Sequence, residues 1–289
     1  WLGSARSGSS LGGVSGSAVA DASAIGSLVM PWHRKLGYPM PFSAASLASA
    51  ATIDIIIPPS IPMIVYGAAA QESVPRLYAA GILPGILIAA MLATYVIWYA
   101  KKHNFDGGEP FNWSRMWTAT KRGMWALGAP IIILGGIYGG VFSPTEAAAV
   151  ASIYAAFVTR FVFRELSARD IIAAAGSTAV FTSQVLIIVA CAGVFGWILT
   201  VNQVPAAMVS FLKEYSVSPW MLLLAINVLL LLVGCFLDPL SAILLLTPLL
   251  VPVVKAVGID TVHFGIVVTV NLAIGLFHPP FGINIFVAQ

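Results

Sequence analysis

Asp238 is the only charged residue between Pro219 and Val254, in the segment Gly-Cys-Phe-Leu-Asp-Pro. An aspartate at the centre of a membrane helix costs about 2.5–3.5 kcal/mol on insertion scales, so such a residue is a functional-site candidate by default. Pro239 follows it directly, and proline suits the first position of a new helix. We therefore predict one helix that ends at Asp238 and a second helix that runs back from it.

Two pairs of consecutive prolines predict two broken helices. Pro58-Pro59 interrupts one apolar stretch, and Pro279-Pro280 interrupts another directly after His278. Such pairs remove two backbone donors, and the exposed carbonyls are costly in lipid unless they line a cavity or bind an ion. An acid that faces a broken helix is one way to build a cation site. The predicted Na⁺ site around the second break comprises Gly234, Asp238, Gly275, His278 and Pro279.

Hydroxyl groups near the N-terminus predict a second Na⁺ site, because sodium prefers hard oxygen ligands and freed carbonyls supply them without a buried charge. This site comprises Ser15, Gly16, Ser17, Pro58 and Ser60. We predict Asp54, Thr182 and Asn271 as neighbours of a bound substrate. Structural alternatives remain open: Asp238 as a helix cap, the small residues as helix-packing positions, His278 facing a neighbouring helix, and Asp54 as a satisfied buried acid.

The composition is that of an integral membrane protein. Of 289 residues, 59% are hydrophobic and only 9% are charged, whereas a soluble domain carries about 25% charged residues. The apolar segments lack the short alternation of outer-membrane strands, so the spans are predicted to be helices. The net charge of +3 is small and the basic residues lie in predicted loops, which indicates topology and not nucleic-acid binding. The two cysteines, Cys191 and Cys235, are interpreted as small core residues.

Two segments stand out among the predicted helices. The stretch from Ser17 to Pro31 is about 15 residues, shorter than the ~20 that a spanning helix needs, so we predict a re-entrant arm followed by a basic loop. Residues 101–122 combine tryptophans with lysines and arginines, which predicts an interfacial amphipathic helix ahead of a separate span from Met124. Ser143-Pro-Thr-Glu is a capping box that predicts a helix start.

The distribution of basic residues predicts the orientation in the membrane. Three basic loops are assigned to the inside: 32–35, 101–122 and 160–169. Three loops poor in basic residues are assigned to the outside: 71–76, 141–143 and 202–218. The arm that ends at Pro31 then opens to the inside, whereas the Asp238 hairpin opens to the outside.

The same series of features occurs near both ends of the chain, and the two copies are predicted to have opposite orientations in the membrane. Each contains a tip acid, a proline, a glycine six residues later, an apolar helix and a Pro-Pro break. Inverted repeats with broken helices that face a midplane site are typical of transporters. We predict a first, partial repeat over residues 1–70, connecting or scaffold helices over 71–176, and a second repeat over 177–289.

Several motifs together resemble the large membrane subunit of tripartite ATP-independent periplasmic (TRAP) transporters. They are Ser15-Gly-Ser-Ala-Val-Ala-Asp, Pro58-Pro-Ser-Ile-Pro with Tyr66-Gly67, Gly140-Val-Phe-Ser-Pro-Thr-Glu-Ala-Ala-Ala-Val, Phe236-Leu-Asp-Pro, and Asn271-Leu with Pro279-Pro-Phe-Gly. The resemblance covers roughly residues 12–289. Residues 1–11 depart from it, because they lack the apolar first arm expected before the Ser-Gly-Ser tip. The earliest helices and the last helix of the family are also missing, so we interpret the chain as a fragment.

The resemblance implies an all-α, elevator-type transporter with two re-entrant helical hairpins, located in the inner (cytoplasmic) membrane of a bacterium or archaeon. It further implies Na⁺-coupled uptake of an organic anion, of the dicarboxylate or sugar-acid class. The implied partners are a small four-helix membrane subunit and a periplasmic substrate-binding protein.

Two other function classes fit the sequence less well. A cation/proton exchanger could use Asp238 and Asp54 as intramembrane proton carriers, although the serine-rich tip favours sodium. An intramembrane hydrolase would need a catalytic set, and neither His-Glu-x-x-His nor Gly-x-Ser-x-Gly occurs in the sequence. We therefore expect a transporter subunit and not an enzyme.

Overall fold

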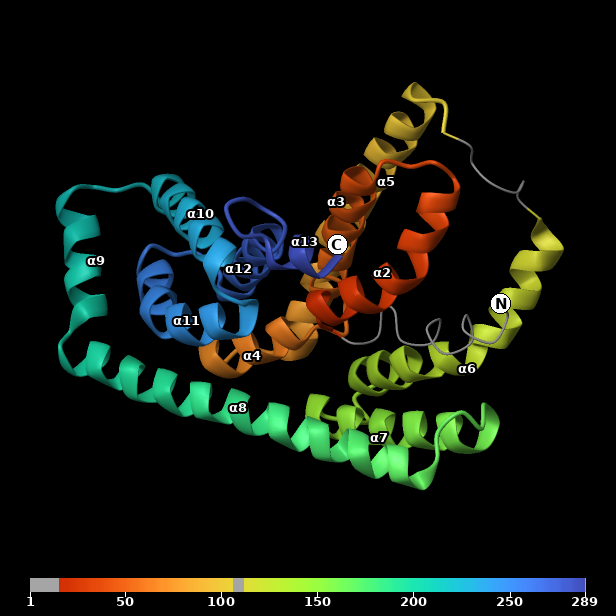
Figure 1. Ribbon diagram of the computed structural model, residues 1–289. Coiled ribbons are helices and arrows are strands. Elements are labelled where there is room, and N and C mark those ends of the chain that lie inside the picture. The colour runs from red at the N-terminus through yellow and green to blue at the C-terminus, as the bar shows by residue number, and fades with distance from the viewer. Residues whose placement is uncertain (1–15, 106–111, 289) are drawn as a thin grey trace.

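The computed structural model describes residues 16–105 and 112–288, and these residues form helices joined by short turns (Figure 1). Five of the described helices are long and apolar enough to cross a membrane. They correspond to α5, α7 with its π-helical extension, α8, α10 and α11. The protein is an all-α integral membrane protein, as its composition predicts.

The helices of the first part of the chain follow the predicted series. They are α2 (Ala18–Lys35), α3 (Met40–Ala51), the 3₁₀ segment η1 (Thr52–Ile55), α4 (Ile61–Ala70) and α5 (Val74–Lys102). The Pro58-Pro59 break falls between η1 and α4, where it was predicted. One prediction was wrong: α2 does not end at Pro31 but continues for one more turn, so that the basic residues 33–35 form its last turn. The positive charges of Arg34 and Lys35 are favourable there, because the C-terminal end of a helix carries a partial negative charge.

The middle of the chain forms α6 (Trp113–Tyr138), α7 (Pro144–Phe157) with the π-helical η2 (Val158–Val162), and α8 (Ala168–Val201). The capping box at Ser143 is confirmed, because its Oγ accepts the Glu146 N–H while the Glu146 carboxylate accepts the Ser143 N–H. The predicted interfacial helix is not separate from the span that follows it. Both belong to the continuous helix α6, since no proline or glycine pair interrupts the chain at their junction.

The last part comprises α9 (Val204–Glu214), α10 (Pro219–Phe236), α11 (Pro239–Ala256), α12 (Thr261–Gly275) and α13 (Ile283–Ala288). The predicted hairpin is confirmed, with α10 ending two residues before Asp238 and α11 starting at Pro239. The second break separates α12 from α13. Both Pro-Pro peptide bonds are cis, and the glycines after α2 and α11, Gly37 and Gly258, have φ angles of 77° and 80°.

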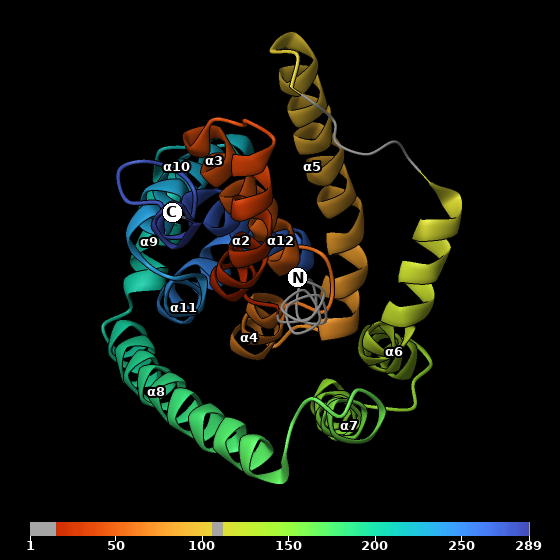
Figure 2. The same ribbon diagram turned by 45° about the vertical axis from the view of Figure 1, so that its right-hand side comes forward.

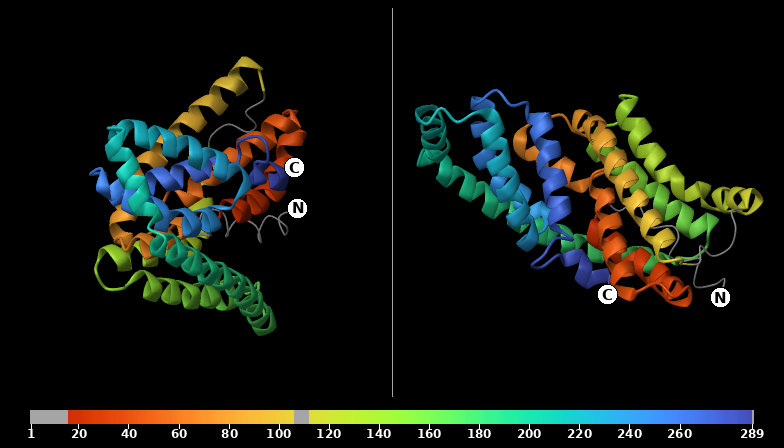
Figure 3. Two further views of the ribbon diagram at one scale, coloured as in Figure 1. Left: turned by 90° about the vertical axis from the view of Figure 1, so that its left-hand side faces the viewer. Right: turned by 90° about the horizontal axis from the view of Figure 1, so that it is seen from above.

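The two ends of the chain pack across each other. Helix α4, which follows the first break, packs on α11 and α12, whereas α13, which follows the second break, packs on α2 and α3. These helices form the central group in Figure 1, while α6, α7 and α8 curve around one side of it (Figures 2 and 3). The proposed sites therefore lie within a bundle to which both ends of the chain contribute.

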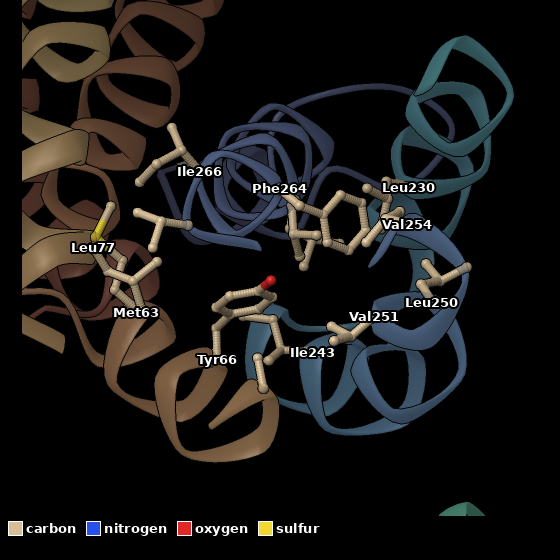
Figure 4. Close-up of a cluster of buried hydrophobic side chains, with 14 of the residues drawn as sticks. Met63, Tyr66, Leu77, Leu230, Ile243, Leu250, Val251, Val254, Phe264 and Ile266 are labelled. Atoms are coloured by element: carbon tan, nitrogen blue, oxygen red, sulfur yellow. The ribbon is translucent and has the colours of Figure 1, made fainter. Parts of the chain in front are cut away.

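The principal core lies where α4, α5, α10, α11 and α12 meet. The ring of Tyr66 points into it from α4 and lies near Phe264 and Ile243 (Figure 4). Its hydroxyl donates to the Thr261 carbonyl oxygen at 2.7 Å, and the Thr261 hydroxyl bonds the carboxylate of Glu72. These contacts join the loop after α4 to the start of α12, two segments that the charge pattern assigns to the same side of the membrane.

Candidate functional site

The first break is held against the N-terminal tip of α2. Gly16 has a φ of +63°, and a Cβ atom built on it would lie 3.3 Å from the Pro59 carbonyl oxygen and 3.2 Å from the Ile61 nitrogen. A side chain at this position would therefore be strained and would crowd the break. Pro58 and Ser60 are buried at the same place. The structure thus brings together Gly16, Pro58 and Ser60 as predicted.

Ser60, at the start of α4, forms hydrogen bonds through its side chain and through both of its backbone polar groups. Its Oγ donates to the Ile55 carbonyl at 2.6 Å and accepts the Met63 N–H at 3.3 Å, which caps the helix. Its own N–H donates to the Tyr78 hydroxyl at 3.3 Å, and that hydroxyl donates back to the Ser60 carbonyl at 3.4 Å. The first break is therefore a fixed structure, anchored from α5.

Ser17 is the N-cap residue of α2 and is half-buried beside the first break. Its carbonyl oxygen accepts the Asp21 N–H at 3.0 Å, which starts the helix. Ser15, the other hydroxyl of the predicted tip, lies outside the described residues. Of the predicted tip residues, the structure therefore describes Gly16 and Ser17.

Asp238 forms the tip of the second hairpin and caps α11. Its two carboxylate oxygens accept the Ser241 N–H at 3.1 Å and the Ser241 hydroxyl at 2.6 Å. These contacts correspond to the cap alternative, and a negative charge at a helix N-terminus is favourable. The rest of the side chain is exposed, so its carboxylate keeps the capacity to accept further ligands.

A pocket of about 150 Å³ lies between α8 and the start of α11, and Asp238 is one of the residues that line it. Its only polar lining besides Asp238 is the amide of Gln184 on α8. The remaining walls are apolar: Phe181, Val185, Ile188, Leu240 and Leu244. Thr182, the residue of α8 predicted to contact substrate, is exposed and does not line this pocket.

The second break lies against the other arm of this hairpin. A Cβ on Gly275 would lie 2.5 Å from the carbonyl carbon of Gly234, so the two glycines let α10 and α12 cross at backbone distance. The Cys235 thiol lies 3.7 Å from His278 Nδ1 and 3.4 Å from the Pro279 carbonyl oxygen. His278 Nδ1 lies 2.6 Å from the same carbonyl. The predicted residues Gly234, Gly275, His278 and Pro279 are thus neighbours.

The two remaining predicted residues have different surroundings. Asp54 lies in η1, half-buried, just before the first break. Asn271 is buried in α12, where its amide nitrogen donates to Asn227 Oδ1 on α10 at 2.6 Å and to the Val267 carbonyl at 2.7 Å. This amide pair joins α10 to α12 inside the bundle.

Three residues at these sites were not predicted as site residues from the sequence: Tyr78, Gln184 and Cys235. Each is a polar or thiol side chain in a mostly apolar stretch of helix, and that contrast was the available signal. Tyr78 is fully buried, and its hydroxyl bonds the backbone of Ser60. Both cysteines were interpreted as core residues. Burial confirms this for Cys235, which also contacts the second break, whereas Cys191 is exposed and that interpretation was wrong.

Residues 4–289 match the family described as tripartite ATP-independent periplasmic transporter, DctM component. The chain belongs to this family. It is 44% identical over 281 residues to the isethionate TRAP transporter permease protein DctMQ of Oleidesulfovibrio alaskensis, covering 96% of this chain and 44% of that protein. It is 38% identical over 276 residues to the C4-dicarboxylate TRAP transporter large permease protein DctM of Pseudomonas aeruginosa, and 42% identical over 277 residues to the ectoine TRAP transporter large permease protein TeaC of Halomonas elongata.

The last two matches cover 96% of this chain and 65% of each relative, so the chain spans less than two thirds of the relatives' length. All three relatives are named as permease proteins and not as enzymes. The resemblance found in the sequence motifs is confirmed. The alternative function, a cation/proton exchanger, receives no support from these relatives.

Proposed function

We propose that this chain provides the ion- and substrate-handling part of a large TRAP permease subunit that takes up a small organic acid together with sodium. The observation that carries the proposal is the packing of the Gly16 tip on the Pro59 carbonyl at a proline-broken helix. Carbonyls at such a break are suited to coordinate Na⁺ near the membrane midplane. The relatives are named for isethionate, C4-dicarboxylate and ectoine, which supports a small organic acid as the substrate class.

The ion sites that we propose are those predicted from the sequence. At the first, Gly16, Ser17, Pro58 and Ser60 supply backbone and hydroxyl oxygens, with Ser15 assigned to the same tip. At the second, Asp238 supplies a carboxylate, and the hairpin arm and the second break adjoin it through Gly234, Gly275, His278 and Pro279. The substrate would lie near the tips, with Asp54, Asn271 and Thr182 as the predicted neighbours and Gln184 added by the pocket geometry.

The membrane potential that acts on sodium would contribute enough energy to drive such uptake. One charge that crosses a potential of 100 mV yields about 2.3 kcal/mol, so two sodium ions yield about 4.6 kcal/mol. At about 1.4 kcal/mol for each tenfold change, this corresponds to roughly three decades of accumulation for a neutral solute. An anionic substrate loses part of the electrical gain.

The partners belong to the same proposal. We propose a small membrane subunit that covers part of the apolar outer faces, and a periplasmic binding protein that delivers the substrate on the outer side. The DctMQ name of one relative, of which this chain spans only 44%, is consistent with a small subunit fused to the large one. The location that follows is the inner membrane of a bacterium or archaeon.

The test is uptake by the complete transporter, reconstituted in liposomes with its small subunit and binding protein. Radiolabelled C4-dicarboxylate, isethionate and ectoine are offered with an inward sodium gradient or with a choline gradient of equal size. We expect uptake of at least one of them that requires sodium and the binding protein. Equal uptake in choline would contradict sodium coupling, and full-rate uptake without either partner would contradict the tripartite assembly.

A further inference from the structure

We propose that Tyr78 is a positioning residue that aims the Pro59 carbonyl at the Gly16 tip, and so sets the sodium affinity of the first site. This inference rests on the proposed sodium coupling. Tyr78 lies on α5, outside the tip and outside the break, and its side chain is fully buried. It acts on the site through the backbone and does not itself contact the ion.

The close approach of α5 to the break depends on Gly81, three residues after Tyr78. A Cβ on Gly81 would lie 2.7 Å from the Ile56 carbonyl oxygen, so α5 can run at this distance only because residue 81 is glycine. At that separation the Tyr78 hydroxyl reaches both the N–H and the carbonyl of Ser60, at 3.3 and 3.4 Å. One hydroxyl therefore holds the two backbone polar groups of the residue that follows the prolines.

The link from Tyr78 to the tip is a single rigid peptide unit. The Ser60 N–H belongs to the peptide bond whose carbonyl is that of Pro59, and this bond is trans. A trans peptide is planar, so its N–H and C=O groups point in opposite directions. Tyr78 fixes the N–H side from α5, and the carbonyl on the other side faces Gly16. Rotation of this plane would turn the oxygen away from the tip.

Tyr66 provides a matched control on the neighbouring helix α4. Both tyrosines are fully buried, and both hydroxyls bond backbone groups of another helix. The Tyr66 hydroxyl bonds the Thr261 carbonyl at the start of α12 and not the backbone of the break. Loss of either hydroxyl removes a buried hydrogen bond, but only the loss at Tyr78 frees the Pro59–Ser60 peptide.

The experiment uses the purified transporter and sodium alone as the probe. Thermal unfolding of wild type, Tyr78→Phe and Tyr66→Phe is followed while NaCl replaces choline chloride at constant ionic strength. The half-stabilising sodium concentration is the concentration that gives half of the maximal rise in melting temperature. Tyr78→Phe is expected to raise it by about two- to tenfold, the effect of one hydrogen bond. Tyr66→Phe should leave that concentration at the wild-type value, although both variants melt at a lower temperature in choline.

Each outcome decides between the two proposals. A wild-type protein that sodium stabilises no more than choline would overturn sodium binding itself, and the inference with it. A sodium-stabilised wild type whose half-stabilising concentration is unchanged in Tyr78→Phe would overturn the role of Tyr78 alone, as would an equal rise in both variants. If Tyr78→Phe does not survive purification, binding of radioactive sodium to membranes that contain each variant gives the same comparison.

Discussion

The two breaks share a pair of consecutive prolines joined by a cis peptide bond, but their surroundings differ. At the first break, Pro58 and Ser60 are buried and a tyrosine from another helix holds the backbone. At the second, His278, Pro279 and Pro280 are exposed in this chain, and the contacts come from the adjoining hairpin arm through Cys235. The first proposed site would therefore offer buried backbone and hydroxyl oxygens, whereas the second proposed site adjoins an exposed carboxylate. This difference predicts unequal responses to substitution.

The largest effect is expected at the crossing of α10 and α12 beside the second break. Gly275→Ala would place a methyl group 2.5 Å from the Gly234 backbone, which cannot move aside as a flexible side chain can. Overpacking of this kind typically costs about 1–3 kcal/mol or more. We expect a lower melting temperature and a lower yield of folded protein.

Gly176→Ala on α8 is the control, because a Cβ there meets nothing within 4 Å. It should leave the melting temperature unchanged or slightly raised, since alanine favours helix over glycine. Equal melting temperatures for Gly275→Ala and wild type would mean that the two helices separate freely, and that the second break is not held by this crossing.

The next effect concerns the charge at the second site. If the Asp238 carboxylate contributes to sodium binding, Asp238→Asn should weaken that binding by about 1.5–3 kcal/mol, a ten- to a hundredfold rise in the half-saturating sodium concentration. Asparagine caps helices about as well as aspartate, so the fold should be preserved. The measurement is the initial uptake rate against sodium concentration.

Asp260→Asn is the matched control for this substitution. Asp260 caps α12 by accepting the His263 N–H at 2.8 Å, as Asp238 caps α11. Its substitution should leave the sodium dependence unchanged. If Asp238→Asn behaves like Asp260→Asn, Asp238 is only a cap and the two breaks do not both bind sodium.

The smallest effect is expected at the first site, where only a neutral ligand is removed. Ser17→Ala should raise the half-saturating sodium concentration by about two- to tenfold, the scale of a neutral hydrogen-bonding contact. Ser27→Ala, on the same helix, removes an exposed hydroxyl that bonds the Ala24 carbonyl one turn earlier, and it should have no effect on uptake. A shift for Ser17→Ala as large as that for Asp238→Asn would remove the distinction between the sites.

The sequence predicted the elements that depend on local chemistry. The hairpin around Asp238, both breaks and the Ser143 capping box are confirmed, because each follows from residues a few positions apart. Pro31 was wrongly taken as a helix end, since a proline inside a helix can be tolerated when neighbouring helices and bonds compensate. The same holds for Pro248 and Pro252 within α11.

The tertiary contacts at the sites could not be predicted in the same way. Nothing near Tyr78 in the chain indicates that its hydroxyl meets Ser60, because the contact depends on how α5 crosses the break. Gln184 lines the Asp238 pocket whereas the neighbouring Thr182 does not, and only the rotation of α8 about its axis decides between them. The inverted repeat and the domain boundaries at residues 70 and 176 stay predictions.

The crossed packing of the two ends has a consequence for biosynthesis. Tyr66 bonds a residue 195 positions later, and the Asn284 amide meets the Ala48 carbonyl across 236 positions. At a synthesis rate of about 5–20 residues per second, α4 leaves the ribosome roughly 10–40 seconds before its partner on α12 exists. During that interval the Tyr66 hydroxyl lacks its partner on α12 and must be sheltered by the insertion machinery or bonded by water. Final assembly of the bundle is therefore expected only after the last helices have been inserted.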